Sequence, residues 1–477
     1  MTDILRPYQR EGITNIFNEW REGTRSVLFQ MPTGTGKTVL FSEIVKMGHD
    51  KDRKILIVAH RKELIEQIIR KLQSKDIESG VIVAGQKSDY SKIVQVASIQ
   101  TLNKRKHPDA NLIIIDECHH AKAKSYKKLW DIYPDAKFLG VTATPIRLNG
   151  SGFDDLFDVL IPAMQINGFI EQGYLSKIKH LVCANPNLAG VRKQRGDYVT
   201  NMLKGVMLHN DLMSNLIGSY KKYAPDKSMI VFAVDVEHSR SIVERYENAG
   251  IAAAHVDSKT PPLQRKELLD AFKQGMIKII SNVEIITEGF DFPECEAVQL
   301  ARPTKSLSLY LQMVGRVMRI APDKKHGIVL DNAGLWLEHG FATLDREWTL
   351  KGTKENKEIK IAAVDDDGAL KEIHKNYPQE AEGLELIELT EELERLLTFE
   401  HYTQTAINKE HKLISAFFKY KEYLESRNIQ ISKVEFDYCK KRLNKLNPTV
   451  NEDKRFKPAF WRIQESNLNF SRRDKAM

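Results

Sequence analysis

The chain has 477 residues, too many for a single hydrophobic core, and its hydrophobic content of 42% is enough for two or three globular domains. No apolar run approaches the roughly 18 residues of a membrane-spanning helix, and the start of the chain lacks the pattern of a secretory signal, so we expect no membrane segment. The four cysteines lie far apart without a CxxC pair, which argues against a zinc site or disulfide framework and favours a cytoplasmic setting. The net charge is +8, and its position along the chain is more informative than its size.

The first third of the chain predicts a sheet of parallel strands. Apolar residues at helical spacing over positions 13–20 indicate an amphipathic helix, and a strand is expected at 26–29. Further strands are expected at 55–59, 81–83, 93–97, 112–115 and 138–141, with a helix over 61–75. Because strands that are apolar on both faces alternate with helices, we expect a doubly wound sheet with its ligand site at the carboxyl ends of the strands.

The same alternation returns later in the chain. Residues 150–225 are rich in Gly and Pro and indicate a connection, with a short strand at 178–182. Beyond it, strands are expected at 229–232, 251–256, 277–281, 297–300 and 328–330, and helices at 236–249, 262–273 and 306–318. The predicted fold class is therefore α/β, with two tandem doubly wound parallel-sheet domains and a mainly helical C-terminal accessory module.

The composition changes past residue 350. Residues 379–400 hold eight Glu and one Arg and indicate a solvated linker and surface helix, whereas 405–447 has apolar positions at helical spacing. Residues 401–477 carry 17 Lys and Arg and 9 Asp and Glu; the first 400 therefore carry 72 less 17, or 55, basic residues and 64 less 9, or 55, acidic ones. All the excess charge lies in this last segment, which suggests a polyanionic partner, although a well-solvated helical surface explains the charge equally well.

The stretch MPTGTGKT, residues 31–38, has the composition of a phosphate-binding loop. It follows an apolar strand and opens a helix, and Gly34 and Gly36 allow the backbone to turn its N–H groups toward a polyphosphate. Lys37 can reach the β- and γ-phosphates, and the Thr38 hydroxyl can bind Mg²⁺. Met31 departs from the strict pattern because it stands where the first Gly of such a loop is usual.

Two carboxylates follow the strand expected at 112–115. Asp116 is placed to order Mg²⁺, and Glu117 to polarise the attacking water as a general base. Cys118 and His119 come next, but further zinc ligands at suitable spacing are absent from the sequence. We therefore expect His119 to contact the next strand end, TAT at 142–144.

An ordered set of nine motifs over residues 5–335 resembles the superfamily 2 helicases and translocases. The motifs are PYQ ending at Gln9, MPTGTGKT, VAHRKELIEQ at 58–67, ASIQTL at 97–102, DECH at 116–119, VTATPIR at 141–147, IVFAVDVEHS at 230–239, NVEIITEGFDFP at 282–293 and QMVGRVMR at 312–319. In this superfamily the first Gly of the phosphate loop is not required. The resemblance implies ATP and Mg²⁺ as cofactors, and ATP hydrolysis in a cleft between two RecA-like domains.

The resemblance also implies roles for single residues. The catalytic set would be Lys37, Glu117, Gln312, Arg316 and Arg319, with the two arginines three apart on one helix face. The nucleotide would be bound by Gln9, Thr33, Gly34, Thr35, Gly36, Lys37, Thr38, Gly289 and Asp291, and Mg²⁺ by Thr38 and Asp116. Nucleic acid would be gripped by Arg61, Thr101, Arg147 and Thr287, and the two events would be coupled by His119, Thr142 and Thr144.

The expected domains are a first RecA-like domain at 1–165, a connector at 166–225, a second RecA-like domain at 226–350, an acidic linker at 351–400 and a basic helical module at 401–477. Residues 331–352 resemble the segment after the last motif in the RadD-like group of bacterial DNA-repair helicases. The cysteine cluster that members of that group often carry is absent from this sequence.

Three functions remain open from sequence. The first is an ATP-dependent DNA helicase or translocase acting on single-stranded, forked or duplex DNA, in repair, recombination or replication. The second is an RNA helicase, since the DECH motif does not separate DNA from RNA. The third is a motor subunit of a restriction or defence complex, which would need a partner chain because no nuclease constellation is evident; the C-terminal module is the expected place for a protein partner.

Overall fold

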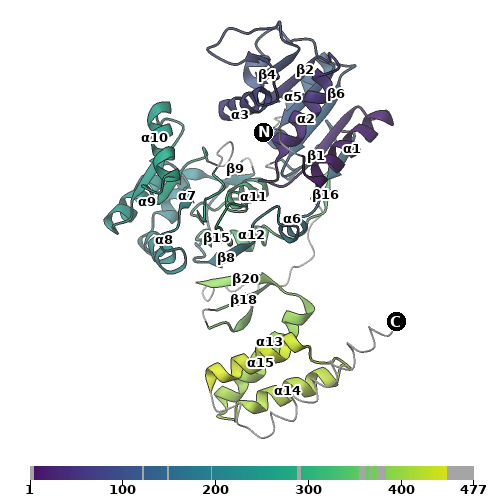
Figure 1. The fold of residues 1–477 in the computed structure, drawn as a ribbon. Helices are drawn as coiled ribbons and strands as arrows, with labels where there is room; N and C mark the ends of the chain where they lie inside the picture. The colour runs from purple at the N-terminus through teal and green to yellow at the C-terminus, as the bar shows by residue number, and fades with distance from the viewer. Residues whose placement is uncertain are drawn as a thin grey trace. The chain divides into compact units, whose positions relative to one another are not determined.

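The computed structural model (Figure 1) describes residues 5–120, 123–147, 150–194, 196–286, 292–353, 361–365, 367–373 and 383–447. The chain divides into two compact units, Met1–Lys357 and Glu358–Met477, which are described separately. Within the described residues no helix is both long enough and apolar enough to cross a membrane.

A seven-stranded sheet forms the first lobe of the first unit. Its strand order is β3-β4-β2-β5-β6-β1-β7, and every neighbouring pair is parallel. The strands are β1 (Ser26–Gln30), β2 (Ile55–Ala59), β3 (Ser79–Ile82), β4 (Val94–Ser98), β5 (Leu112–Asp116), β6 (Lys137–Thr142) and β7 (Val159–Pro162). The strands expected from the apolar runs are confirmed to within two residues at each end, and β7 at the sheet edge was not expected.

Helices cover both faces of this sheet because successive strand residues point to opposite sides. The helices α1 (Pro7–Arg21), α2 (Lys37–His49) and α3 (Lys62–Gln73) pack on the face that carries Phe29, whereas α4 (Ile99–Leu102) and α5 (Ala123–Ile132) pack on the face that carries Leu28. Helix α1 lies so close to β1 that a Cβ atom on Gly12 would stand 2.6 Å from Phe29 Cζ. Sequence alone predicted this helix from its apolar spacing.

Six parallel strands of the same unit build the second lobe, in the order β12-β13-β11-β14-β15-β8. They are β8 (Ile178–Val182), β11 (Met229–Phe232), β12 (Ala253–Val256), β13 (Ile279–Asn282), β14 (Ala297–Leu300) and β15 (Gly327–Asp331). The strand expected at 178–182 is confirmed, and it pairs with β15 inside this sheet. The segment predicted as a connection thus contributes a strand to the second lobe.

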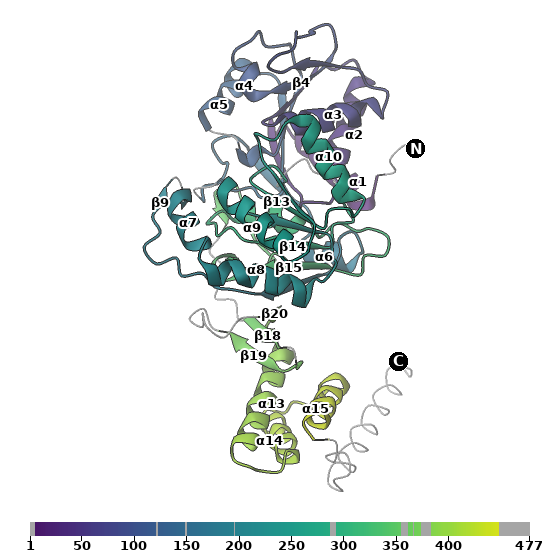
Figure 2. The same cartoon turned by 90° about the vertical axis from the view of Figure 1, so that its left-hand side faces the viewer.

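Two layers of helices enclose this second sheet. Figure 2 shows α8 (Asn210–Tyr223) and α9 (Val236–Asn248) in front of its strands, and their side chains share a core with the outward-facing strand residues. The opposite face packs on α10 (Pro262–Lys273) and α11 (Leu307–Gly315), whereas α6 (Ile166–Glu171) contributes Phe169, whose ring contacts Tyr8 of α1. Helices α7 (Thr200–Met207) and α12 (Leu335–His339) and the short hairpins β9 (Lys193–Gln194)–β10 (Asp197–Tyr198) and β16 (Trp348–Thr349)–β17 (Gly352–Thr353) complete the unit.

The helix predicted over 306–318 is shorter than expected. It ends at Gly315, and the next turn closes with bonds of the i to i−3 kind from the N–H of Arg316 to Met313 O and of Val317 to Val314 O. Val317 and Met318 are buried, and we attribute the end of the helix to the packing of these two side chains in the core. Gly315, the last helical residue, also has a low helix propensity. The prediction that Arg316 and Arg319 share one helix face is therefore wrong: Arg316 caps the helix and Arg319 lies beyond it.

The second unit combines a small antiparallel sheet with three helices. The strands β18 (Ile361–Val364), β19 (Leu370–Ile373) and β20 (Leu384–Glu388) pair with β18 at the centre. The helices α13 (Glu391–Asn408), α14 (Ile414–Glu425) and α15 (Lys433–Leu446) enclose a core that includes Phe399, Phe417, Tyr420 and Phe436. The helical expectation for 405–447 is confirmed, whereas the three-stranded sheet was not expected.

The acidic stretch 379–400 is not simply a linker. It supplies β20, in which Leu384 and Leu386 are buried, and the first turns of α13, where Thr390 accepts a hydrogen bond from the N–H of Leu393 as the N-cap. The glutamates of this first turn lie where negative charge stabilises a helix. The surface helix expected in this stretch corresponds to the start of α13, whereas β20 was not expected because glutamates alternate with its buried leucines.

A buried carboxylate fastens α15 to α13. Glu435 is fully buried and accepts hydrogen bonds from Arg395 Nε at 2.7 Å, from the Tyr420 hydroxyl at 3.2 Å and from the backbone N–H of Ser432 at 2.8 Å. Burial opposes its ionisation, but the hydrogen bonds from Arg395 and Ser432 hold the pKa of Glu435 below its usual value. The pair with Arg395 is thus a buried, ionised one.

Replacing Arg395 with Met should lower the free energy of unfolding of the second unit by about 3 kcal/mol, because it leaves the Glu435 carboxylate buried without its cation. Hydrogen exchange of the α13 and α15 amides in the full chain measures this change. Lys421→Met is the matched control: it removes the exposed pair with Glu425 and should cost no more than about 0.5 kcal/mol. Equal effects from both variants would contradict the role of burial.

Candidate nucleotide site

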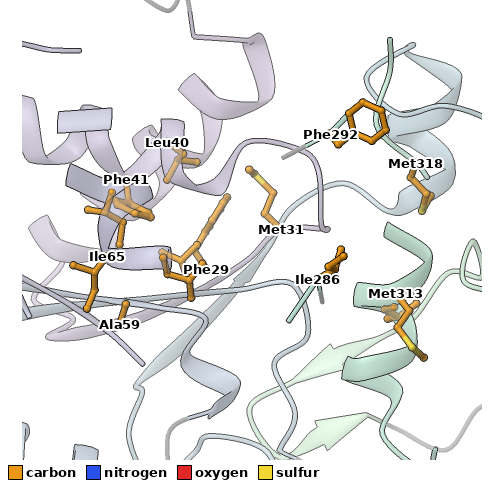
Figure 3. Close-up of a cluster of buried hydrophobic side chains, with 14 of the residues drawn as sticks. Phe29, Met31, Leu40, Phe41, Ala59, Ile65, Ile286, Phe292, Met313 and Met318 are labelled. Atoms are coloured by element: carbon orange, nitrogen blue, oxygen red, sulfur yellow. The ribbon is translucent and has the colours of Figure 1, made fainter. Parts of the chain in front are cut away.

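The phosphate loop follows β1 and leads into α2. Gly34 and Gly36 have φ of +85° and +90°, in the left-handed region that favours glycine. Lys37 is the first residue of α2, and its Nζ donates to the Met31 carbonyl at 3.3 Å. Met31, in the place of the usual first Gly, is fully buried; Figure 3 shows it in the same apolar cluster as Phe29 and Leu40. The side chain at this position therefore belongs to the core and not to the loop.

The shape of the loop fits a polyphosphate. A Cβ on Gly36 would stand 2.7 Å from Gln9 Nε2, and the Gly36 residue itself lines the cavity. The Thr33 hydroxyl is buried and makes no hydrogen bond within the described residues. Successive N–H groups that precede a helix, together with Lys37, form the kind of cradle that phosphate groups occupy.

The two predicted carboxylates lie opposite the loop. Asp116 ends β5 and Glu117 follows it with φ of +47°, a left-handed conformation that is uncommon for Glu. Glu117 Oε1 lies 3.6 Å from Lys37 Nζ, and the Glu117 N–H donates to Asp116 Oδ1 at 3.0 Å. Burial raises the pKa of the Cys118 thiol well above its usual value, so this neighbour is a protonated core residue.

Mg²⁺ would be held by Asp116 and Thr38, because both line the cavity above the loop. Among the described residues, no group of three or more His, Cys, Asp or Glu side chains could hold a metal ion by itself. That arrangement suits Mg²⁺, which commonly takes one or two protein ligands and completes its shell with substrate phosphates and water.

A chain of hydrogen bonds joins the carboxylates to the second lobe. His119 Nδ1 lies 3.0 Å from Thr142 Oγ1, as expected, and 3.3 Å from Glu117 Oε2. His119 Nε2 lies 2.8 Å from the Gln312 amide nitrogen on α11, which can only donate. In this arrangement Nε2 accepts from Gln312, which leaves Nδ1 as the ring nitrogen that can donate to Thr142.

A second bond crosses between the lobes nearby. The Thr144 hydroxyl donates to Ser308 Oγ on α11 at 2.6 Å, and the Thr142 hydroxyl donates to Thr144 O at 3.1 Å. The expected coupling residues thus lie in one buried network with Gln312. Ser308 joins this network although no sequence pattern singled it out.

The second-lobe arginines reach the phosphate loop in spite of the shortened helix. Arg316 and Arg319 line one cavity of about 1190 Å³ together with Lys37, Asp116 and Glu117. A Cβ on Gly34 would stand 3.2 Å from Arg319 Cγ, and a Cβ on Gly315 would stand 2.7 Å from Thr33 Cβ. The two lobes are thus in van der Waals contact at the loop itself.

Gln9 is bonded to the back of the loop. Its amide nitrogen donates to Gly36 O at 3.2 Å, and its amide oxygen accepts from the Arg6 N–H at 2.9 Å. The Tyr8 hydroxyl donates to Thr35 O at 2.6 Å. Beside them, the Arg6 guanidinium lies 5.4 Å from the centre of the Tyr174 ring, and both side chains line the cavity.

Sequence reasoning missed Arg6 and Tyr174. Arg6 could have been noticed, because it lies in the LRPYQ stretch beside Gln9. Tyr174 lies in the segment predicted as a connection, where no motif marks it.

The residues expected to bind nucleic acid are not among those that line this cavity. Arg61 donates to Glu284 O across the lobes at 2.5 Å, and Thr101 is buried, with its N–H bonded to Ser98 Oγ at 3.2 Å. Arg147 donates to Asp155 and to Gly152 O, both at 2.6 Å, and lies over the Phe153 ring. Three expected residues, Thr287, Gly289 and Asp291, lie outside the described part of the chain.

Comparison with known proteins agrees with this geometry. Residues 3–147 match the family "Type III restriction enzyme, res subunit", and residues 209–321 match "Helicase conserved C-terminal domain". A 51.5 kDa protein of Lactococcus phage (isolate 7-9) is 35% identical over 322 residues, which cover 67% of this chain and 68% of the phage protein.

A yeast protein and a solved structure are also similar to this chain. IRC3 of Saccharomyces cerevisiae, described as a candidate ATP-dependent helicase, is 30% identical over 355 residues, covering 69% of this chain and 52% of the yeast protein. The solved structure of the ATP-dependent Type ISP restriction-modification enzyme LlaBIII bound to DNA aligns with a TM-score of 0.55 at 21% identity, over 69% of this chain and 28% of that enzyme. At that identity the structural likeness concerns the fold alone, and the matched region is about half of the yeast protein and less than a third of LlaBIII.

Substitution of Gly36 by Ala should weaken nucleotide binding at least tenfold, or about 1.4 kcal/mol, because the new Cβ would collide with Gln9 and strain the left-handed backbone. Titration with a fluorescent ATP analogue measures the affinity. Gly85→Ala is the matched control, since Gly85 also has positive φ but no atom stands within 4 Å of its Cβ position. Unchanged affinity in Gly36→Ala would contradict the geometry assigned to this loop.

Proposed function

This chain belongs to the superfamily 2 helicases, and from that premise we propose that it is a nucleic-acid-stimulated ATPase that moves along DNA. The ATP use common to its helicase relatives agrees with the phosphate loop. The observation that carries the proposal is the cavity built by both lobes, with Lys37, Asp116 and Glu117 from one lobe and Arg316 and Arg319 from the other. A site divided in this way can convert ATP binding and hydrolysis into relative movement of the lobes.

The residues of the first lobe bind the substrate and prepare the attacking water. The loop from Thr33 to Gly36 and the ammonium of Lys37 would hold the phosphates of ATP. Gln9 does not line the cavity, and to read the adenine its amide would have to leave the Gly36 carbonyl. Glu117, held between Lys37 and His119, accepts the proton of the attacking water. Mg²⁺, bound by Thr38 and Asp116, would offset the charge of the β- and γ-phosphates.

The residues of the second lobe stabilise the transition state. Arg316 and Arg319 bring positive charge to the γ-phosphate, where an arginine finger contributes on the order of 10³–10⁵ in rate. Gln312 transmits the state of the γ-phosphate, because its amide is bonded to His119, which is in turn beside Glu117. Thr142 and Thr144 extend this network to Ser308 on α11.

For the nucleic acid, we propose contacts with the phosphate backbone by Arg61, Thr101, Arg147 and Thr287. Gly289 and Asp291, which belong to the same motif as Thr287, would bind the nucleotide. Contacts of this kind allow movement along a strand without sequence specificity. Arg147 would have to leave Asp155 to make such a contact.

We assign the motor to DNA repair, recombination or replication, in the RadD-like group. The similarity of residues 331–352 to that group supports this role, and the helicase name of the yeast relative supports the motor activity alone. Residues 1–165 and 226–350 would be the RecA-like halves of the motor, joined by 166–225, and residues after 351 an accessory region.

The match to a restriction-enzyme family supports a second candidate, a motor subunit of a restriction or defence complex. Such a subunit would act with a nuclease supplied by a partner chain. Co-purification of the full chain with a nuclease would favour this role, and full DNA-dependent activity of the isolated chain would weigh against it.

Single-stranded DNA should stimulate ATP hydrolysis more than RNA of the same sequence, and Glu117→Gln should lower the stimulated rate at least about 100-fold through loss of the general base. The measurement is phosphate release with single-stranded, duplex and forked DNA and with RNA. Glu247→Gln, an exposed position on α9, is the matched control and should keep the full rate.

Stronger stimulation by RNA would favour the RNA helicase. A Glu117→Gln protein that hydrolyses ATP at the normal rate would sink the role given to this residue. ATP binding should survive this substitution, because an amide in place of the carboxylate would still leave Lys37 and the loop in position.

Loss of the basic charge of residues 401–477 should make DNA binding less dependent on salt, since this segment carries 17 Lys and Arg against 9 Asp and Glu. Each lost phosphate contact reduces the slope of log K against log salt by about 0.9 on duplex DNA. A cut at residue 401 would divide α13, and a cut at Glu358 would also remove the acidic residues of 358–400, so the exposed Lys433 and Lys441 of α15 should be replaced by Gln in the full chain. An unchanged slope would indicate a protein-docking or purely structural module.

A further inference from the structure

The position of Arg319 needs an explanation because no helix holds it. The residue lies four positions beyond the end of α11, in a stretch without regular structure. Its side chain nevertheless lies against the phosphate loop, with Cγ 3.2 Å from the Cβ position of Gly34. An arginine that stabilises a transition state must keep its place to within a fraction of an ångström.

Two side chains converge on the Arg319 carbonyl. Lys324 Nζ donates to Arg319 O at 2.8 Å, and Ser176 Oγ donates to the same oxygen at 3.0 Å. The Ser176 N–H also donates to Met318 O at 2.7 Å. The main chain on either side of the Met318–Arg319 peptide is thus fixed by groups from elsewhere in the chain.

Lys324 also reaches the strand-end segment before β14. Its Nζ donates to Pro293 O at 2.9 Å, so one ammonium bridges the carbonyls of residues 293 and 319. Pro293 is the last residue of the motif at 282–293, which precedes β14, and Arg319 is the last residue of the motif at 312–319, which follows β14. Lys324 is not among the residues that line the nucleotide cavity, so it contacts Arg319 from outside that cavity.

Ser176 connects the same carbonyl with the phosphate loop. Its neighbour Leu175 is buried, with Cδ2 3.5 Å from the Cβ position of Gly34, beside Arg319 Cγ. Two successive residues of the segment before β8 therefore touch the loop and hold the arginine.

We propose that Lys324 and Ser176 are positioning residues that hold the main chain of Arg319, and through it the guanidinium, over the phosphate loop. This inference rests on the proposed function, because the position of Arg319 matters to catalysis only if the guanidinium acts on the γ-phosphate. Neither residue touches substrate. Their contribution should appear in kcat for ATP hydrolysis and leave ATP binding almost unchanged.

The ammonium is held in a partly buried place. Burial foremost lowers the pKa of Lys324 to about 8; nearby Cys295, Glu294 and Glu296 oppose this shift and Arg319 adds to it. Glu296 is paired with Lys227 at 2.7 Å, and burial raises the pKa of Cys295 to about 12. The ammonium of Lys324 therefore loses its proton near pH 8, where the Cys295 thiol still keeps its own.

The test compares Lys324→Met with Lys325→Met, the matched control at the exposed neighbouring position. Lys324→Met should lower the DNA-stimulated kcat by roughly 10- to 100-fold, the range that a misplacement of about 1 Å can produce. The KM for ATP should stay within about threefold of the original, and Lys325→Met should match the unchanged chain. A thermal melt shows whether each variant is folded.

Combination with Arg319→Ala separates positioning from general support of the fold. If Lys324 acts through Arg319, adding Lys324→Met to Arg319→Ala should cause no further loss of kcat, because residues that act as a unit are not additive. Multiplied losses would overturn the proposal. Should Lys324→Met not fold, Ser176→Ala gives the same test, since it removes only one hydroxyl from the same carbonyl.

The pH dependence supplies a second measurement. Below pH 8 the charged ammonium is the stronger donor, and above it the neutral amine binds the carbonyls more weakly. The ratio of kcat between the unchanged chain and Lys324→Met should therefore shrink from pH 7 to 9.5. A constant ratio would contradict the role of the ammonium.

These outcomes differ from a failure of the proposed function. A chain whose ATP hydrolysis no nucleic acid stimulates would contradict the proposed function itself. A stimulated chain in which Lys324→Met and Lys325→Met behave alike would leave the proposed function standing and refute the positioning role alone.

Discussion

The contact between Gly315 and the phosphate loop is the constraint on which the rest of the site depends. A side chain at position 315 would stand 2.7 Å from Thr33 Cβ, so only glycine lets the second-lobe backbone reach the loop. That approach brings Arg316 and Arg319 into the same cavity as Lys37. Neither lobe alone has both the phosphate cradle and the additional cations. The cavity is complete only while this contact lasts.

In the proposed function, the polar network beside the contact would make the site sensitive to the γ-phosphate. Glu117 lies between Lys37 and His119, and His119 accepts the hydrogen bond of Gln312 from the second lobe. A phosphate that draws Lys37 away from Glu117 would leave Glu117 without that partner. Glu117 is linked to Gln312 on α11 through a single residue, His119. Buried hydrogen bonds of this kind are costly to leave unmade, so a change at one end favours rearrangement at the other.

The amino-acid sequence predicts the parts of this protein that depend on local pattern. Apolar runs located the parallel strands, and the strand-end motifs located Lys37, Asp116, Glu117 and His119, because the carboxyl ends of parallel strands meet at one edge. The end of α11 was missed, since burial of Val317 and Met318 is a tertiary effect. Strand β20 of the second unit was missed because glutamates alternate with its buried leucines. Tyr174 was missed because its role comes from its place beside Arg6 and no spacing marks it.

The loop position of Arg319 has a mechanical consequence. A finger on a helix moves only with the whole helix, whereas Arg319 is held by two hydrogen bonds to one carbonyl, from Lys324 and Ser176. Such bonds are individually weak enough to break and reform as a cleft opens and closes. Ser176 lies directly after Leu175, which touches Gly34, so movement of the loop is passed to the arginine through two adjacent residues. The place of Arg319 thus depends on these contacts with Lys324 and Ser176 and not on the last turn of α11.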